Sequence, residues 1–250
     1  MNYNVAGYCE ILMNLKSNGY IFIDFSELKS RRKKCVLLRH DIDNDVQAAW
    51  EMAKIESELG IKATYFFMTR SPLYNLFSRH NDSLVRKILS MGHSLGLHYD
   101  QGYDEKRKID AEESKQQIES ECRYLEKAFD TKIAGVSFHQ PSERLLSSSE
   151  FSLKTRVNTY DKMSLRGYKY FSDSNRSLNN NFMFEYIERS TLIDEDGNIQ
   201  LLIHPMWWIY EQQAVTDVWN IVMENTLKYA MPQLLETERA FGLKRKISVS

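Results

Sequence analysis

Apolar residues recur at the three- and four-residue spacing of amphipathic helices in four parts of the chain. Two of these segments cover residues 5–15 and 46–53, and a glycine that can end a helix follows each of them. A longer segment covers residues 110–129 and begins with the spacing of a capping box. The last is expected to begin with Thr216 as its N-cap. The pattern therefore predicts a helix near each end of the chain and two between them.

Short apolar runs of strand length lie between the helical segments. They cover residues 36–38, 63–67, 95–97, 134–138, 168–171 and 200–203. Strands that alternate with helices of a dozen or more residues are typical of βαβ units, whose strands are parallel. We therefore expect an α/β fold with a largely parallel sheet, either closed as a barrel or open.

Carboxylates or imidazoles follow five of these strand-like runs. They are Asp41 and Asp43, His98 and Asp100, His139, Asp173, and His204. In a parallel α/β barrel the carboxyl ends of the strands open on one face, where active sites are built. The pattern therefore predicts one cluster of acids and imidazoles drawn from much of the chain.

The alternation of side chains along a strand decides which of these residues can face the same way. Asp41 and Asp43 are two residues apart and are expected to point to one side, while His40 faces the other. His98 is assigned to the site, whereas His93 has the opposite parity and is assigned a structural role. Two carboxylates so close repel each other unless a cation lies beside them. A divalent metal ion would let one aspartate bind it while the other stays a free base.

The charge of the chain limits the kinds of partner that it can bind. The 250 residues carry 33 Lys and Arg against 34 Asp and Glu, a net charge of -1, which lacks the basic footprint of nonspecific nucleic-acid binding. No apolar run approaches the ~20 residues that span a bilayer, and the first residues lack the features of an export signal. We expect a cytoplasmic protein that binds no nucleic acid. We also expect one domain over residues 1–250, with a motif-bearing core at about 35–210, because the site residues extend across that core.

Six segments, taken in order, resemble the motifs of the NodB-homology polysaccharide deacetylases, which form carbohydrate esterase family four. They are RHDID at 39–43, ATYFF at 63–67, GHSLGLH at 92–98, FHQP at 138–141, SDS at 172–174 and LIHP at 202–205. The RHDxD form of the first segment is most similar to a cytoplasmic, WbmS-like branch associated with surface-polysaccharide and O-antigen biosynthesis. The resemblance implies a distorted (β/α)7 barrel, here with additional N- and C-terminal helices.

The resemblance also implies a hydrolase that uses a metal ion to remove N-acetyl or O-acetyl groups from sugars. In that family the first motif supplies the general base and a metal ligand, which fall here on Asp41 and Asp43. His204 matches the histidine that acts as general acid, and Asp173 matches a fourth-motif aspartate that can tune it. We therefore expect a metal-dependent deacetylase with Asp41, His204 and Asp173 as its catalytic residues.

The set of metal ligands is left incomplete by the resemblance. The family's second motif supplies two histidines four residues apart; the first matches His98, but Gly102 stands at the position of the second. The third ligand is therefore either Asp100, which shares the parity of His98, or His139, which stands where the family usually has an arginine that orients the base. Such nitrogen and oxygen ligands suit one divalent ion, zinc first, and also iron, cobalt, nickel or manganese.

Residues that flank the expected site are candidates for substrate binding. We expect Tyr99, Tyr103 and Trp207 to pack against the apolar face of a sugar, and we assign Arg39 and His139 to substrate binding as well. The expected partner is an acetylated sugar, a sugar nucleotide or a polysaccharide precursor. The oligomeric state is left open.

Two other functions are compatible with the same residues. Aspartates and histidines at strand ends also suit another metal-dependent amidohydrolase. The missing second histidine of the family suits a non-catalytic sugar-binding protein. Stoichiometric divalent metal is expected of an enzyme and not of the non-catalytic form, and acetate release distinguishes a deacetylase from other hydrolases.

Overall fold

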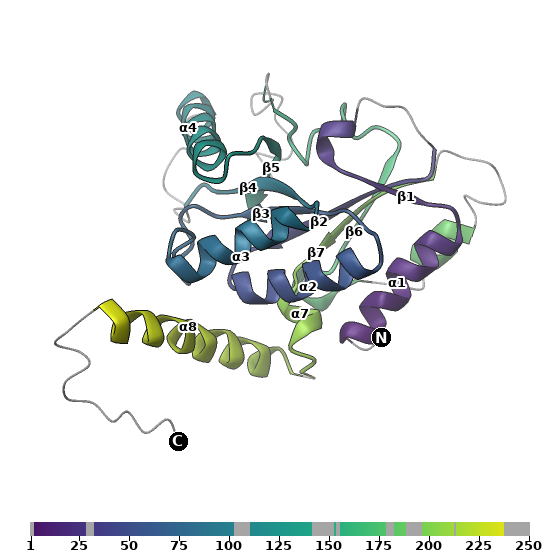
Figure 1. Cartoon of the computed structure of the whole chain (residues 1–250). Coiled ribbons are helices and arrows are strands. Elements are labelled where there is room, and N and C mark those ends of the chain that lie inside the picture. Colours follow the sequence, from purple (N-terminus) through teal and green to yellow (C-terminus); the bar gives the residue numbers. More distant parts are fainter. Residues whose placement is uncertain are drawn as a thin grey trace.

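The protein is built on one curled parallel sheet with helices packed against it (Figure 1). The computed structural model describes residues 3–28, 33–102, 111–141, 153, 156–178, 183–188, 197–212 and 214–237. The strands are β1 (Ile21–Ile23), β2 (Cys35–Ile42), β3 (Thr64–Phe67), β4 (Ser94–Asp100), β5 (Ile133–His139), β6 (Tyr168–Ser172) and β7 (Asn198–Ile203). Their order across the sheet is β5-β4-β3-β2-β7-β6, with β1 beside the start of β2. All these pairs are parallel, so the carboxyl ends of the strands meet at one edge.

Helices pack against the sheet, and the described chain has a helix near each of its ends. The helices include α1 (Val5–Ser17), α2 (Val46–Glu58), α3 (Arg79–Ser90), α4 (Ala111–Phe129), α7 (Met206–Ile209) and α8 (Val215–Thr237), with 3-10 turns η1 (Phe25–Glu27) and η3 (Ser174–Arg176). Figure 1 shows α1, α2 and α3 along one side of the sheet and α8 further out. The short helix α7 contacts α1, α2 and α8 and so connects the last helix to the rest.

Polar side chains cap the N-termini of three of these helices. Asn4, Asp45 and Ser78 each accept a hydrogen bond from a backbone N–H in the first turn of α1, α2 and α3, respectively. Such a cap satisfies a donor that has no partner within the helix, and it stabilises the fold by about 0.5–2 kcal/mol. The cap at Asp45 also fixes the chain two residues after Asp43.

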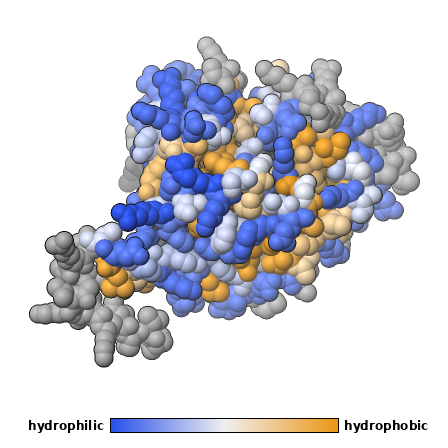
Figure 2. Space-filling model, viewed as in Figure 1, coloured by the Kyte–Doolittle hydropathy of each residue, from blue (hydrophilic) through white to orange (hydrophobic). Residues whose placement is uncertain are grey.

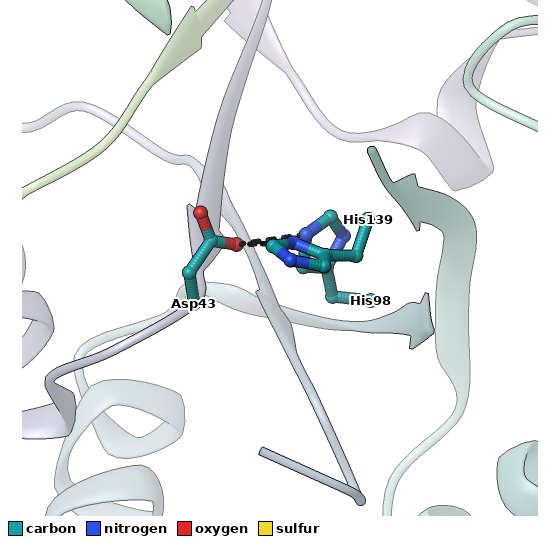
Figure 3. Close-up of side chains that lie close together, drawn as sticks. All are labelled: Asp43, His98 and His139. Carbon is teal, nitrogen blue, oxygen red and sulfur yellow. Dashed lines mark ion pairs between the residues drawn. The ribbon is translucent and has the colours of Figure 1, made fainter. Parts of the chain in front are cut away.

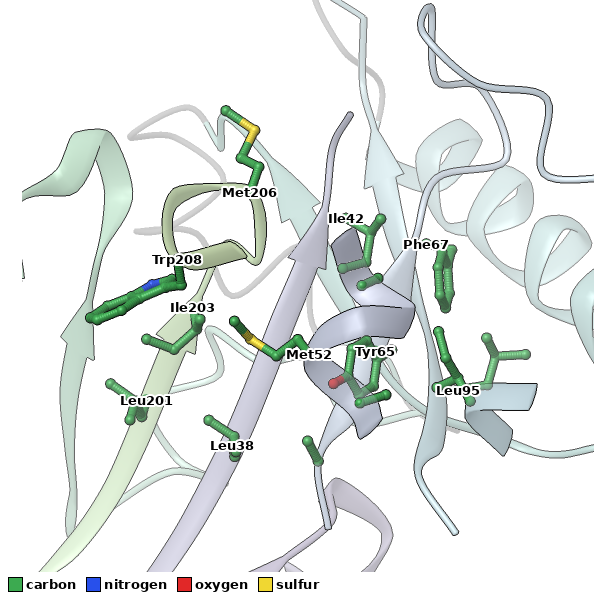
Figure 4. Packing of buried hydrophobic residues seen from close by; sticks show 14 of the residues in the cluster. Leu38, Ile42, Met52, Tyr65, Phe67, Leu95, Leu201, Ile203, Met206 and Trp208 are labelled. Atoms are coloured by element: carbon green, nitrogen blue, oxygen red, sulfur yellow. The ribbon is translucent and has the colours of Figure 1, made fainter. Parts of the chain in front are cut away.

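The larger apolar core lies between the sheet and its helices. Figure 4 shows Leu38 of β2 and Tyr65 of β3 in this core, together with Met52 of α2. Each fully buried side chain of this size contributes about 1.5–3 kcal/mol to folding. Every second residue of β2 points into this core, so Arg39 and Asp41 point to the opposite face of the sheet.

That opposite face changes from apolar to polar along the strands. Near the amino end, Leu37 and Phe66 belong to a second apolar cluster with Phe25. Further along β2 comes Arg39, whose guanidinium lies 5.7 Å from the centre of the Phe66 ring. Asp41 follows, so this face becomes polar only near the carboxyl ends of the strands.

The prediction of an α/β fold with parallel strands and a helix near each end is confirmed. Helix α3 was missed because its buried residues are limited to Leu84, Val85 and Ile88 in an otherwise polar segment. Thr216 is not the N-cap of the last helix, since α8 already begins at Val215. The expected start of the helix at residue 110 lies outside the described residues.

The surface is largely hydrophilic on the face shown in Figure 2, with small apolar patches between the polar side chains. None of the helices in the described part of the chain combines the length and the apolar character that a bilayer crossing requires.

Candidate metal centre

The carboxyl ends of four strands surround a cavity of about 420 Å³. Asp41 and Asp43 line it from β2 and the residues directly after it, His98 from β4, His139 from β5, and His204 from the end of β7. Apolar parts of the wall come from Phe138, Tyr160, Met206, Trp207 and Trp219. A cavity of this size, with a few convergent polar groups, is typical of a small-molecule site.

Asp43, His98 and His139 form a group that can hold a metal ion. His98 Nε2 lies 2.9 Å from Asp43 Oδ1, and His139 Nδ1 lies 3.3 Å from the same oxygen. The three ligand atoms lie within 4.8 Å of one another. Figure 3 shows both rings directed at the Asp43 carboxylate from neighbouring strands.

The chemistry of this group fits a divalent ion. Asp43 Oδ1 is buried and makes no hydrogen bond of regular geometry with the described part of the chain, although two imidazole nitrogens face it. Burial raises the pKa of Asp43, but the His139 and His98 side chains outweigh this and hold the pKa well below its ordinary value. One ionised carboxylate and two imidazoles are the ligand types that zinc, iron, cobalt, nickel or manganese accept.

Asp41 lies beside this group and is held by Arg39. Arg39 Nε donates to Asp41 Oδ1 (2.9 Å) and Nη2 donates to Oδ2 (2.6 Å), and both side chains are buried. Arg39 also donates to Thr159 Oγ1 and to the Tyr160 hydroxyl. Burial raises the pKa of the Asp41 carboxyl, but the Arg39 guanidinium outweighs this and keeps the pKa below its ordinary value. Asp41 is therefore an ionised carboxylate of fixed direction.

His204 is bound to a buried carboxylate on the other side of the cavity. His204 Nδ1 lies 2.6 Å from Asp173 Oδ1, and the His204 backbone N–H donates to Oδ2 of the same residue. Trp208 Nε1 also donates to Asp173 (2.8 Å). Burial lowers the pKa of His204, but Asp173 outweighs this and raises the pKa to about 9. His204 is therefore protonated at neutral pH, with its Nε2 side toward Asp43 (3.8 Å from Oδ2).

The structure distinguishes the two candidates for the third ligand. His139 lies with Asp43 and His98 in the group described above. Asp100 is the residue directly opposite His139 in the β4–β5 ladder, but its Oδ1 accepts a hydrogen bond from Gly102 N (2.9 Å). The geometry therefore favours His139.

The predicted substrate-binding residues lie in different places. Trp207 and His139 line the cavity. Arg39 is completely buried, and its guanidinium donates to Asp41, Thr159 and Tyr160. Tyr99 has the parity opposite to that of His98, so it points into the helix-covered core and its hydroxyl donates to Gln117 Oε1 (2.7 Å). Tyr103 lies outside the described residues.

Three residues near the site were not identified from the sequence. Ser137 has the same parity as His139, and this signal was available in the sequence. Tyr160 and Trp219 line the cavity from a turn and from α8. Neither follows a strand-like run, so no local pattern connects them with the site.

His40 and His93 lie on the helix-covered side, as their parity predicts. His40 Nε2 lies 2.6 Å from Glu56 Oε1, and the Tyr65 hydroxyl donates to the other oxygen of Glu56. His93 Nε2 lies 3.1 Å from the backbone oxygen of Ala53. These contacts join β2 and the start of β4 to α2, away from the cavity.

The chain matches no protein-family model and no curated protein. Solved structures that are similar to it include a CE4 family pseudoenzyme from Bacillus anthracis, with 16% sequence identity over 79% of this chain and 62% of that chain and a TM-score of 0.45. A family 4 carbohydrate esterase from Bacillus anthracis has 14% identity over 94% of this chain and 96% of that chain, with a TM-score of 0.44.

A chitin deacetylase from the fungal pathogen Colletotrichum lindemuthianum has 14% identity over 79% of this chain and 83% of that chain, with a TM-score of 0.43. The chain spans 62% of the length of the pseudoenzyme structure. At these identities and TM-scores, the similarity does not transfer an activity to this chain.

Proposed function

We propose that this protein is a metal-dependent deacetylase that removes an acetyl group, in the first place N-acetyl, from a sugar or sugar precursor. The observation that carries the proposal is the group of Asp43, His98 and His139 beside Asp41 and His204 in one cavity. Three ligands, a separate ionised carboxylate and a protonated imidazole are the parts that metal-assisted hydrolysis of an amide requires.

Asp43, His98 and His139 would hold the metal ion. When bound, a divalent ion supplies a Lewis acid that polarises the acetyl carbonyl and lowers the pKa of water. Asp41 accepts a proton from the water molecule while the water oxygen attacks the acetyl carbon. Arg39 fixes the direction of Asp41 during this transfer.

His204 is the proton donor for the leaving group. Its Nδ1 is bound to Asp173, so the proton on Nε2 is the one directed at the cavity. Donation of this proton to the sugar nitrogen accompanies cleavage of the C–N bond, and acetate and a sugar amine are released. Asp173 stabilises the protonated imidazole before the transfer.

The further parts of the proposal come from the likeness of residues 39–43 to the RHDxD branch. They are a role in surface-polysaccharide or O-antigen biosynthesis, a cytoplasmic location, and an acetylated sugar, sugar nucleotide or polysaccharide precursor as substrate. Zinc is the first choice of metal, and one domain over residues 1–250 carries the activity.

Acetate release from a panel of N-acetylated sugars and sugar nucleotides tests the proposal. Asp41→Asn is expected to lower kcat by ~100-fold or more, because a positioned general base contributes that much, while the variant retains stoichiometric metal. Asp100→Asn is the matched control and is expected to keep both properties. An active Asp41→Asn variant would overturn the assignment of the base, and wild-type protein that binds no divalent metal would overturn the proposal.

A non-catalytic sugar-binding role is the second candidate. It is favoured by Gly102, which stands where the second histidine of the family's metal motif is expected. In that case the wild-type protein binds N-acetylated sugars without stoichiometric metal and without release of acetate.

A further inference from the structure

Ser137 lies between a residue of the metal group and the proposed base. It is on β5, directly opposite His98 of β4 in the ladder, and it is completely buried. Its Oγ is 2.6 Å from His98 Nδ1 and 3.2 Å from Asp41 Oδ1. A single hydroxyl on β5 therefore connects a side chain of β4 with one of β2, two strands that are separated by β3.

The positions of the protons determine what this hydroxyl can do. His98 directs Nε2 at Asp43, so Nε2 is the ligand atom. A neutral imidazole whose Nε2 lone pair is used in this way carries its proton on Nδ1. The Nδ1–H group must then donate to Ser137 Oγ, and the hydroxyl keeps its own single proton for another acceptor.

Asp41 Oδ1 is that acceptor. The Ser137 hydroxyl donates to this oxygen across 3.2 Å, and the same oxygen accepts from Arg39 Nε (2.9 Å). The direction of both hydrogen bonds is therefore fixed: from His98 to Ser137, and from Ser137 to Asp41.

We propose that Ser137 is a positioning residue that sets the ring orientation and tautomer of His98 for metal binding and, with the same hydroxyl, holds the Asp41 carboxylate. The inference rests on the proposed function and adds to it a residue that connects the metal group to the base. A partner on the second nitrogen of a metal-binding histidine is worth ~10–100-fold in metal affinity or activity.

Removal of the hydroxyl tests the inference. Ser137→Ala removes both hydrogen bonds, and Ser137→Cys replaces the hydroxyl with a larger thiol that is only a weak donor and acceptor. Thr64→Val is the matched control, because Thr64 Oγ1 is a buried hydroxyl of the same sheet that finds no hydrogen-bond partner among the described residues. Circular dichroism shows that each variant is folded before it is used.

Zinc affinity is measured by competition with a chelator, and the imidazole N–H protons of zinc-loaded protein are followed by NMR. Both Ser137 variants are expected to bind zinc ~10–100-fold more weakly than wild type. The slowly exchanging N–H proton of His98 is expected in wild type and Thr64→Val and is lost in Ser137→Ala. At saturating zinc, the kcat of both Ser137 variants is expected to be lower than that of wild type, while their KM for the sugar is unchanged.

The outcomes separate this inference from the function on which it rests. Wild-type protein that binds no divalent metal ion overturns the proposed function and the inference with it. Wild-type protein that binds zinc, together with a Ser137→Ala variant of unchanged affinity and an unchanged His98 proton signal, overturns the inference alone.

Discussion

Arg39 and Asp41 form a buried ion pair at the centre of the sheet. The guanidinium donates to both oxygens of Asp41, and it also contacts Thr159, the Tyr160 hydroxyl and ring, and the Phe66 ring. Removal of one partner of such a pair leaves a buried charge without compensation, which costs about 3–5 kcal/mol. Arg39 was assigned to substrate binding from the sequence, because a sequence pattern does not show that this side chain is completely buried.

The pKa of His204 gives the protein a dependence on pH. The folded-state pKa is raised to about 9, from an ordinary value of 6.5. This raised pKa adds stability that is fully present below the unfolded pKa and is lost as the pH rises through about 9. The difference corresponds to a few kcal/mol, because each pKa unit is worth about 1.4 kcal/mol.

Urea unfolding of metal-free protein between pH 6 and 9 measures this contribution. We expect the free energy of unfolding of wild type to fall over this range, relative to that of His204→Gln, which lacks the titrating group. Deacetylase activity of the metal-loaded protein should also fall at alkaline pH, since His204 loses the proton that it donates to the leaving group. Parallel stability profiles of the two proteins would contradict the assigned pKa shift.

Among the elements, β3 and β4 pair in such a way that Gly96 lies directly opposite Phe66. A Cβ atom at this position would lie 2.3 Å from Cδ1 of Phe66. The Phe66 ring has little freedom to move away, because it packs edge-on against Phe25 and faces the Arg39 guanidinium. The space beside the Phe66 ring therefore accommodates a residue at position 96 only if it has no side chain.

Gly96→Ala is expected to lower the free energy of unfolding by about 1–3 kcal/mol, the usual cost of overpacking. Phe66→Leu in the same chain should restore part of this loss, since the smaller side chain leaves room for the methyl group. Denaturant unfolding of the two single variants and the double variant measures the coupling. Strictly additive effects would show that the Phe66 ring is not what excludes the methyl group.

Helix α8 shows what an element distant in sequence adds to the site. Of its residues, Val218 and Val222 are buried, while Trp219 is partly exposed and lines the cavity. Its ring lies 6.4 Å from that of Trp207, at an angle of 83°. The helix was predicted from its period, but its place beside the cavity depends on contacts with α7.

At the scale of the whole molecule, the metal group joins residues that are far apart in the chain. Binding to the folded state alone stabilises a protein by about 2.7 kcal/mol when the free ligand is at 100 times its Kd. Zinc is therefore expected to raise the Tm of wild type, and a chelator should reverse the effect. His139→Ala should lose the increase, because it lacks the third ligand.

Asp100→Asn is the control for this measurement and should keep the zinc-dependent increase in Tm. Loss of the increase in Asp100→Asn, with retention in His139→Ala, would show that Asp100 is the third ligand. Differential scanning calorimetry with and without zinc provides the comparison.

The sequence by itself determined the alternation of strands and helices and the common face of Asp41, Asp43 and His98. Both follow from the period of the side-chain pattern, which is 3.6 residues in a helix and two in a strand. Such a short period can be recognised within a single segment of the chain. The same period would have placed Tyr99 in the core, because it is adjacent to His98.

Only the tertiary structure decided between Asp100 and His139 as the third ligand. The two residues lie opposite each other at the end of the β4–β5 ladder, so parity and strand order cannot distinguish them. The choice depends on the direction of each side chain above the curled sheet, and this direction is set by packing between strands. The tertiary structure also decided that Arg39 is buried against Asp41 and that Trp219 lines the cavity. Contacts between distant segments leave no periodic signal in the sequence.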